Sequence, residues 1–177
     1  PGQSVLDIGI GTGLAAVLFR SAGLRVYGMD TSQEMLDACR SKGFTDLARH
    51  DLTAPPYPYA AESLDHAVCV GVLSFFRDLS PVFGEAGRIL RSGGLFVFVV
   101  GDRSDDEPAE MVVGPEYTRS AAPVTVFRHS ARQIDGWLAE SGFTTLRSLA
   151  FTVPVDRGRT RSLQAKAYLV SKGADAD

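Results

Sequence analysis

The sequence contains few of the features that hold a very small domain together or anchor a chain in a membrane. It has only two cysteines, Cys39 and Cys69, and their spacing fits no metal site or disulfide framework. No apolar run approaches the ~20 residues that are needed to span a bilayer. The formal net charge of −3 leaves no basic footprint for DNA or RNA. We therefore expect no metal, nucleic acid or membrane as partner, and two reduced thiols in a cytoplasmic protein.

The length of 177 residues suits one domain, which we expect over residues 1–172, followed by a flexible tail at 173–177. Strand-like segments alternate with helical patterns, which predicts a parallel sheet covered on both faces. In the first predicted helix Leu14, Val17 and Leu18 share one apolar face. The predicted strands cover residues 4–8, 24–29, 44–50, 64–72 and 95–100, and the predicted helices cover 12–22, 32–41 and 80–90.

The last part of the chain changes pattern after an irregular segment at 101–128. Ser130 and Gln133 form a capping box that begins a further helix. Two predicted strands follow, at 143–153 and 160–171, and the link between them is too short for a crossover helix. The predicted fold class is therefore α/β: a Rossmann-like, doubly wound, seven-stranded and mostly parallel sheet with a C-terminal antiparallel β-hairpin.

The first predicted strand ends in a glycine-rich bend that follows an acidic residue. Glycines at 9, 11 and 13 allow the backbone to approach a ligand closely, and the N–H groups of the following helix favour an anionic group. Asp7, inside the strand, disfavours a diphosphate but suits a ligand that carries an ammonium group. The dinucleotide fingerprint also fits on paper if it starts at Gly11 and uses Gly13 and Ala16, but this leaves Gly9 and Asp7 unexplained.

Two more acidic residues follow predicted strands. Asp30 ends the second strand, where a carboxylate can accept both hydroxyls of a ribose. Its alternative role is to cap the next helix, for which Ser32 is better placed. Asp51 and Leu52 follow the third strand, and they can receive an adenine amino group and pack on its ring. The alternative for Asp51 is an Asx turn into the proline-rich loop that follows it.

Taken together, these segments resemble the class I S-adenosylmethionine-dependent methyltransferases along nearly the whole chain. The segments that carry the resemblance are, in order, VLDIGIGTG, VYGMDTSQEML, ARHDLT, LDHAVCVGVLSFF and RILRSGGLFVFVV. Within this class the chain is most similar to the domains that methylate small molecules. The resemblance implies S-adenosyl-L-methionine as the cofactor and an unidentified small molecule as the methyl acceptor. Class members usually carry one or two helices before the first strand, which here begins almost at Pro1.

The resemblance also implies a role for individual residues. The glycine bend would line the methionine half of the cofactor, with Asp7 near its amino group, and Asp30 would hold the ribose. Met35 would pack on the adenine, although its helical spacing suits a core position equally well. Val70 and Gly71, at the end of the fourth strand, would face the methyl group. The complete set of expected cofactor contacts is Asp7, Gly9, Ile10, Gly11, Gly13, Asp30, Thr31, Met35, Asp51, Leu52, Val70 and Gly71.

The sequence assigns no catalytic residue, because methyl transfer needs a base only when the acceptor keeps its proton. We expect His66 to be structural and His50 to face solvent. His129 is a candidate base, but a position at the start of a helix is the favoured interpretation. The arginines near 119–132 and 157–161 are interpreted as solvated surface charge rather than an anion site.

Two other functions stay open at this point. The first is an NAD(P)-binding Rossmann oxidoreductase, and the second is a domain that binds S-adenosylmethionine without catalysis. The oligomeric state is not indicated by the sequence.

Overall fold

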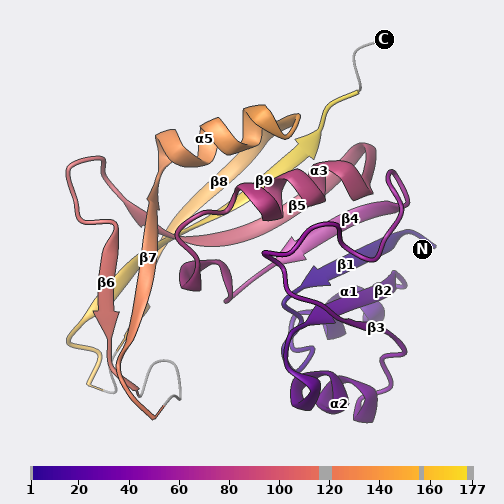
Figure 1. Ribbon diagram of the computed structural model, residues 1–177, viewed down its shortest axis with the longest axis horizontal. Helices are drawn as coiled ribbons and strands as arrows, with labels where there is room; N and C mark the ends of the chain where they lie inside the picture. The colour runs from indigo at the N-terminus through magenta and orange to yellow at the C-terminus, as the bar shows by residue number, and fades with distance from the viewer. Residues whose placement is uncertain (1, 116–120, 156–157, 175–177) are drawn as a thin grey trace.

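The computed structural model describes residues 2–115, 121–155 and 158–174, and its helices and strands alternate over most of that length (Figure 1). The strands are β1 Ser4–Ile8, β2 Arg25–Asp30, β3 Asp46–Arg49, β4 Leu64–Cys69, β5 Leu90–Arg103, β6 Glu110–Val113, β7 Val124–Ser130, β8 Phe143–Pro154 and β9 Ser162–Lys172. The helices are α1 Ala16–Ser21, α2 Gln33–Ser41, α3 Ser80–Ile89 and α5 Ala131–Glu140, with a 3-10 turn at Leu73–Phe75.

Seven of the strands form the predicted sheet, in the order β3-β2-β1-β4-β5-β9-β8. The first five pair in parallel, while β9 pairs antiparallel with both β5 and β8. This confirms the Rossmann-like sheet and the C-terminal hairpin, whose last strand is inserted between β5 and β8. The carboxyl ends of β1, β2 and β4 consequently meet at one edge of the sheet, which is where ligands bind in folds of this kind.

The segment at 101–128, which the sequence left without regular structure, contains two more strands. β5 continues to Arg103, and β6 and β7 form an antiparallel ribbon that joins β5 through the pairs between residues 101–103 and 128–130. The described sheet therefore has nine strands rather than seven. β6 has only four residues, and β7 lies at the end of the segment that showed no regular pattern. In Figure 1 the ribbon extends away from the β1–β3 side of the molecule.

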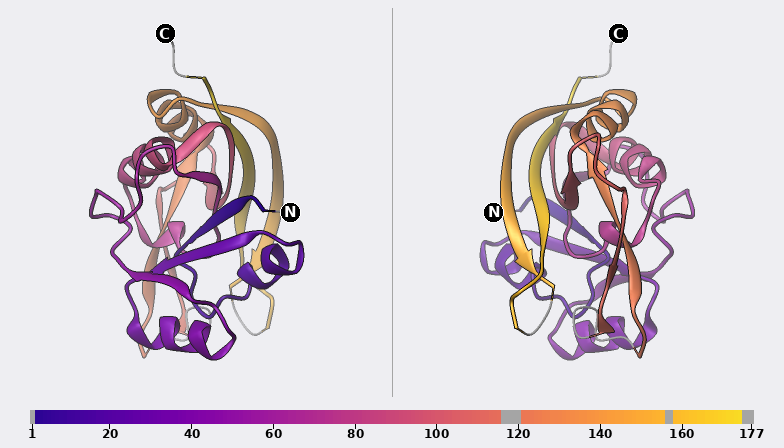
Figure 2. Two further views of the ribbon diagram at one scale, coloured as in Figure 1. Left: turned by 90° about the vertical axis from the view of Figure 1, so that its right-hand side faces the viewer. Right: turned by 90° about the vertical axis from the view of Figure 1, so that its left-hand side faces the viewer.

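Helices lie on both faces of the sheet, as a doubly wound fold requires. Helices α3 and α5 lie together on one face (Figure 2), and α1 and α2 contact β2 on the other. Each face has its own apolar core, the larger one beneath α3 and α5 and the smaller one beneath α1 and α2. Side chains of β1 alternate between the two, because successive residues of a strand point to opposite faces. Leu6 and Ile8 enter the larger core, whereas Val5 enters the smaller one.

Helix α1 is shorter than predicted and presents a different face. It begins at Ala16 rather than Thr12, because Gly13 has a φ of +77° and cannot continue a right-handed helix. Ala16 is buried, but Leu14 and Leu18 are 82% and 74% exposed. The expectation that these two leucines belong to the apolar face is therefore wrong.

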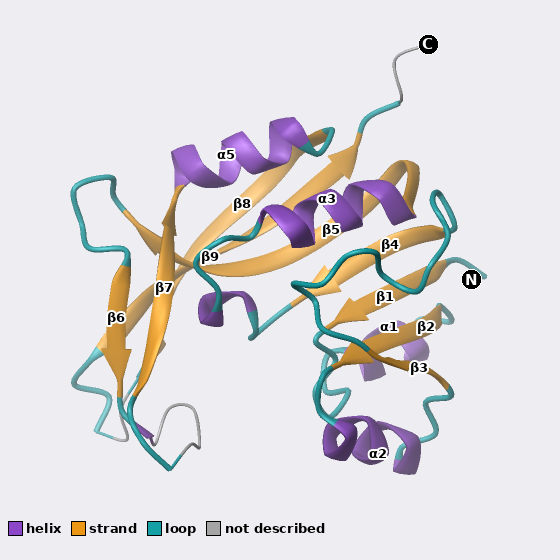
Figure 3. Cartoon of the chain, in the orientation of Figure 1, coloured by secondary structure: helices purple, strands orange, loops and turns teal. Residues whose placement is uncertain are grey.

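The connection between β3 and β4 is a loop, as the prolines predicted, and not a helix (Figure 3). An ion pair on α3 holds it in place, with Arg88 Nη2 2.6 Å from Glu85 Oε2. Arg88 also donates to the carbonyl oxygens of Tyr57 and Tyr59, and Glu85 accepts the backbone N–H of Tyr57. The Tyr57 hydroxyl in turn donates to the carbonyl oxygen of Leu52 at 2.8 Å. Helix α3 thereby fixes the position of Leu52 at the edge of the sheet.

Both cysteines are buried and free, in agreement with the expected reduced thiols. No helix in the described ranges is long and apolar enough to cross a membrane. Of the tail expected at 173–177, the N–H of Gly173 donates to Gly142 O at 2.8 Å, and residues 175–177 lie outside the described residues. The flexible tail therefore stays a prediction.

The different burial of two apolar side chains gives a test of the fold. Phe83 is fully buried, with its ring centroid 4.9 Å from that of Phe98 and 6.0 Å from that of Trp137. We expect Phe83→Ala to lower the free energy of unfolding by about 3–5 kcal/mol, since it leaves a cavity in the core. Leu18→Ala, at an exposed site, should change it by less than about 0.5 kcal/mol. Urea unfolding measures both, and comparable losses in the two variants would contradict this packing.

Candidate functional site

The glycine bend between β1 and α1 is anchored to the end of β2. The backbone N–H groups of Gly9 and Ile10 both donate to Met29 O, at 2.9 and 3.0 Å. The N–H of Gly13 closes the turn onto Ile10 O at 2.9 Å. Gly9, Gly11 and Gly13 have φ values of +74°, +53° and +77°, a region that residues with a side chain rarely adopt. This conformation explains why glycine recurs at every second position.

The three glycines differ in the space around them. A Cβ on Gly9 would lie 2.9 Å from Val72 Cγ1, and one on Gly13 would lie 2.9 Å from Phe44 Cε2. A Cβ on Gly11 would meet nothing within 4 Å. The bend is thus packed tightly at its two ends and open in the middle, so a ligand can lie directly against the backbone at Gly11.

The carboxylate of Asp30 holds this open part of the bend. Its Oδ2 accepts the N–H of Gly11 and its Oδ1 accepts the N–H of Ser32, both at 2.9 Å. A carboxylate offers about four lone-pair positions, so roughly two remain for further donors such as the two hydroxyls of a ribose. The N-cap of α2 is Ser32, whose hydroxyl accepts the N–H of Met35, as predicted.

Asp7 is an ionisable group inside the sheet. Its strand pairs with β2 on one side and β4 on the other, and the residue is only 3% exposed. Burial, and to a lesser extent the negative charge of Asp30, raise the pKa of the Asp7 carboxyl to about 7. A cation bound beside the two carboxylates would reverse both effects. The pair therefore favours a ligand with a positive charge.

A small cavity of about 60 Å³ lies at the edge of the sheet beside the bend. Four of its lining residues belong to the set expected from sequence, namely Gly9, Asp30, Thr31 and Leu52. The other lining residues are Met29, His50, Val72 and Phe76. Met29 is the second-last residue of β2, His50 follows β3 directly, and Val72 and Phe76 flank the 3-10 turn after β4. The order of the strands, once known, would have indicated them.

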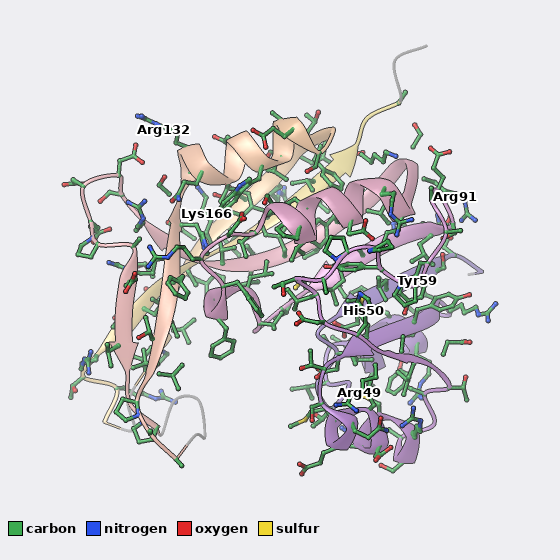
Figure 4. All side chains as sticks on the ribbon, viewed as in Figure 1. Arg49, His50, Tyr59, Arg91, Arg132 and Lys166 are labelled. Carbon is green, nitrogen blue, oxygen red and sulfur yellow. The ribbon has the colours of Figure 1, made fainter. Side chains whose placement is uncertain are left out.

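His50 lies against this site and does not simply face solvent, as had been expected. It follows β3 directly, and Figure 4 shows it on the side of the molecule formed by β1–β3. Its ring centroid is 5.5 Å from that of Tyr57, and its Nε2 lies 2.8 Å from Ala54 O. These contacts give the ring a fixed place in the wall of the small cavity.

Three of the expected residues have structural positions that narrow their role. Met35 is 36% exposed, so the alternative of a core position is wrong. Asp51 Oδ1 accepts both the N–H and the hydroxyl of Thr53 at 2.8 Å, which is the Asx turn considered as its alternative role. The Ile10 side chain is buried in the smaller core, where it packs against Gly28. As cofactor contacts these three residues stay predictions.

A second cavity, of about 500 Å³, begins where β4 ends, and Val70 and Gly71 form part of its wall. Val72, the next residue, lines the small cavity instead. The chain from Val70 to Val72 thus separates the two cavities. The expected cofactor residues do not all surround one cavity, because Val70 and Gly71 line the larger one and Asp30 lines the smaller one.

The comparisons with known proteins agree with this arrangement. Residues 6–98, more than half of the chain, match a family model described as "Methyltransferase domain". The chain belongs to the methyltransferase domain family. Its cofactor is accordingly S-adenosylmethionine, and the predicted resemblance is confirmed.

Individual proteins show how far this similarity extends. The chain is 30% identical over 136 residues to the malonyl-[acyl-carrier protein] O-methyltransferase of Serratia marcescens, which covers 72% of the chain and 51% of that relative. It is 37% identical over 92 residues to the demethylmenaquinone methyltransferase of Chlorobaculum parvum, covering 51% and 37%. The chain therefore spans about half of the Serratia relative, and less of the Chlorobaculum one.

Solved structures share the fold at low sequence identity. A structure described as a SAM-dependent methyltransferase from Methanosarcina mazei superimposes with a TM-score of 0.80 at 16% identity, and covers 98% of this chain and 94% of that one. This similarity establishes the arrangement of the strands and helices. The chemistry of the site depends on the residues of this chain.

The histidines of the methyltransferase domain do not form an obvious catalytic base. His129 is buried, and its Nε2 lies 3.1 Å from Phe76 O and 3.3 Å from Arg77 O, so that nitrogen carries a proton and donates it. Burial lowers the pKa of the His129 ring. Its ring fastens the loop after β4 to the start of α5, which agrees with the favoured helix-start interpretation. His66 Nδ1 accepts the N–H of Leu95 at 3.4 Å, a contact inside the sheet.

The arginines near the irregular segment contact other parts of the domain. Arg128 donates to Pro108 O at 2.7 Å, and Arg161 donates to Val112 O at 3.2 Å. Arg132 pairs with Asp105 at the start of α5, far from His50 (Figure 4). Arg119 and Arg157 lie outside the described residues. Arg132 and Arg161 are exposed, in agreement with solvated surface charge, whereas the Arg128 side chain is only 13% exposed, so for Arg128 that interpretation is wrong.

The buried position of Asp7 gives a test that needs no ligand. Because the folded chain holds this proton more tightly than the unfolded chain, its contribution to stability is present below about pH 4 and is lost as the pH rises towards about 7. Asp7→Asn removes the charge, so the variant should gain up to about 4 kcal/mol over the wild type at pH 8 and little at pH 4. Urea unfolding of both proteins at the two pH values measures the difference. A difference that does not depend on pH would refute the raised pKa.

Proposed function

We propose that this domain transfers the methyl group of S-adenosylmethionine to a small-molecule acceptor, with the cofactor lying along the glycine bend. The observation that carries the proposal is a pair of acids at the bend: Asp30 holds the open backbone at Gly11, and its charge acts on the buried Asp7. A diphosphate would bring negative charge towards two carboxylates. A nucleoside that carries an amino acid brings an ammonium group, which suits Asp7, and two ribose hydroxyls, which suit Asp30.

The other expected contacts follow if the cofactor lies along the glycine bend with its ammonium group at Asp7 and its ribose at Asp30. The adenine would lie towards Leu52, with Thr31, Met35 and Asp51 at its edges, since Leu52 and Thr31 line the small cavity. Gly9 and Gly13 would shape the backbone under the methionine half, and Ile10 would anchor it in the core. The methyl group would then point towards Val70 and Gly71.

The work left to the protein is alignment of the acceptor and exclusion of water. When bound, the cofactor would supply the methyl carbon: its bond to sulfur would break with the electron pair left on sulfur, the acceptor atom would bond to the carbon, and the acceptor's proton would pass to solvent. The segment from Val70 to Val72 separates the cofactor from the larger cavity, and so it would set the distance between the reacting atoms.

The names of the relatives agree with a small acceptor group. The Serratia relative is a malonyl-[acyl-carrier protein] O-methyltransferase and the Chlorobaculum relative is a demethylmenaquinone methyltransferase. These acceptors differ from each other, so the comparison supports methyl transfer without choosing an acceptor. A cytoplasmic location for the domain is part of the same proposal.

The ribose contact can be tested by calorimetry with S-adenosylhomocysteine. Asp30→Asn replaces one carboxylate oxygen by an amide nitrogen, which cannot accept a hydrogen bond. We expect the Kd to rise by about tenfold or more, because a hydrogen bond to a charged group contributes about 1.5–3 kcal/mol.

Asp37→Asn is the matched control, because Asp37 lies on the exposed side of α2 and pairs with Arg40. It should leave the Kd unchanged. An unchanged Kd in Asp30→Asn would contradict the contact between Asp30 and the ribose. A wild-type protein that binds NADH and not S-adenosylhomocysteine would instead support the oxidoreductase. Binding without methyl transfer to any tested acceptor would favour a non-catalytic domain.

The proposal also predicts how affinity depends on pH. The ligand's ammonium should bind the ionised form of Asp7, and the free carboxyl gives up its proton only near pH 7. The Kd for S-adenosylhomocysteine should therefore fall as the pH rises from 6 to 8. In Asp7→Asn the Kd should be higher and nearly constant over that range. A wild-type Kd that does not change with pH would contradict the contact between Asp7 and the ammonium.

A further inference from the structure

The larger cavity is built mainly from the half of the sheet that the cofactor does not use. Its lining comes from the segment that follows β4, the second half of β5, the end of β8 and the start of β9. The residues are Val70, Gly71, Ser74, Phe75, Val99, Val100, Gly101, Phe151, Val153, Leu163 and Ala165. Its volume of about 500 Å³ lies within the range of pockets that hold small organic ligands.

The lining is almost entirely apolar. Ser74 carries the one polar side chain among the described lining residues, and no charged side chain from those residues takes part. An ionised group that enters such a space loses its hydration and finds no partner there, which costs free energy. An apolar body gains by leaving water in the same place.

The mouth of the cavity leaves apolar side chains open to solvent. Val70, Phe75 and Phe151 are 44%, 40% and 37% exposed. Exposed apolar surface that continues into a cavity is typical of a binding groove. A ligand that lies across this mouth would cover these three side chains.

The cavity also lies directly beside the cofactor site. Val72, which follows Val70 and Gly71 in the wall, packs so closely on the bend that a Cβ on Gly9 would lie 2.9 Å from its Cγ1. Gly71 has a φ of +82°, and a Cβ at this residue would meet nothing within 4 Å. Open space therefore adjoins the backbone at Gly71, where the methyl group is expected.

We infer that this cavity binds the methyl acceptor, and that the acceptor is an uncharged, largely apolar molecule such as an aromatic ring system whose single neutral polar group lies near Ser74. This inference rests on the proposed function, because it takes the neighbouring site as that of the cofactor. It excludes acceptors whose body carries a carboxylate or a phosphate inside this cavity.

The neutral fluorescent dye Nile red provides a probe for the cavity in the protein saturated with S-adenosylhomocysteine. Ala165 is 3% exposed and forms part of the wall, so Ala165→Leu should fill the space and raise the Kd of the dye by about tenfold. Ala167→Leu is the control, because Ala167 lies two residues further along β9, on the same face but outside the lining. It should change the Kd less than about twofold.

The charge requirement is tested with two competitors of the same ring system. At neutral pH, 2-naphthol should displace the dye at a concentration about tenfold lower than 2-naphthoate, because only the latter carries a charge into the cavity. Equal competition by the two compounds would refute the requirement for an uncharged acceptor. Equal dye binding by Ala165→Leu and the wild type would refute the cavity as the binding place.

Calorimetry with S-adenosylhomocysteine on the same three proteins separates this inference from the proposed function. If S-adenosylhomocysteine binds with one Kd to all three while the dye does not respond to Ala165→Leu, the inference alone fails. If the wild type does not bind S-adenosylhomocysteine, the proposed function fails first. Circular dichroism and urea unfolding show whether both leucine variants fold, and a folded Ala165→Leu variant that binds the dye normally overturns the inference.

Discussion

Two backbone N–H groups, from Gly11 and Ser32, share the carboxylate of Asp30, and this contact ties the glycine bend to the start of α2. The bend can neither collapse onto the sheet nor swing away from it, because Met29 O holds its first two N–H groups as well. The open backbone at Gly11 depends on these contacts. One acidic side chain at the end of β2 therefore organises the bend and still has room to accept further donors.

The buried carboxyl of Asp7 and the partly buried carboxylate of Asp30 disfavour each other's negative charge. Asp7 would lose its proton readily in water, but burial and the nearby charge of Asp30 oppose this in the folded chain. In the proposed complex a bound ammonium group would offset this repulsion, so that part of the binding energy would come from its relief. Perturbed acids of this kind are common at functional sites for this reason.

Sequence patterns were sufficient wherever the deciding contacts are local. The positive φ values of the glycines at 9, 11 and 13 and the capping box at Ser130 are set by residues within a few positions of each other, and the structure has both. The predicted start of α1 was wrong because the positive φ of Gly13 interrupts the helical pattern of the sequence. The ribbon of β6 and β7 and the cavity residue Phe76 were missed because they are placed by strands far away in sequence. Asp51 shows the remaining difficulty, since one side chain fits a turn and a ligand equally well.

The ribbon of β6 and β7 meets the rest of the sheet at few points, and one of them bears on the choice of substrate. Val113 and Val126 in the ribbon pack with Val155 and Leu163, and Leu163 is also part of the larger cavity. Insertions or substitutions within the ribbon would shift Leu163, because they change the side chains that pack against it. The strands around Asp7 and Asp30 would keep their positions. If the larger cavity binds the acceptor, as we infer, changes in this peripheral segment would alter the choice of substrate without rebuilding the proposed nucleoside site.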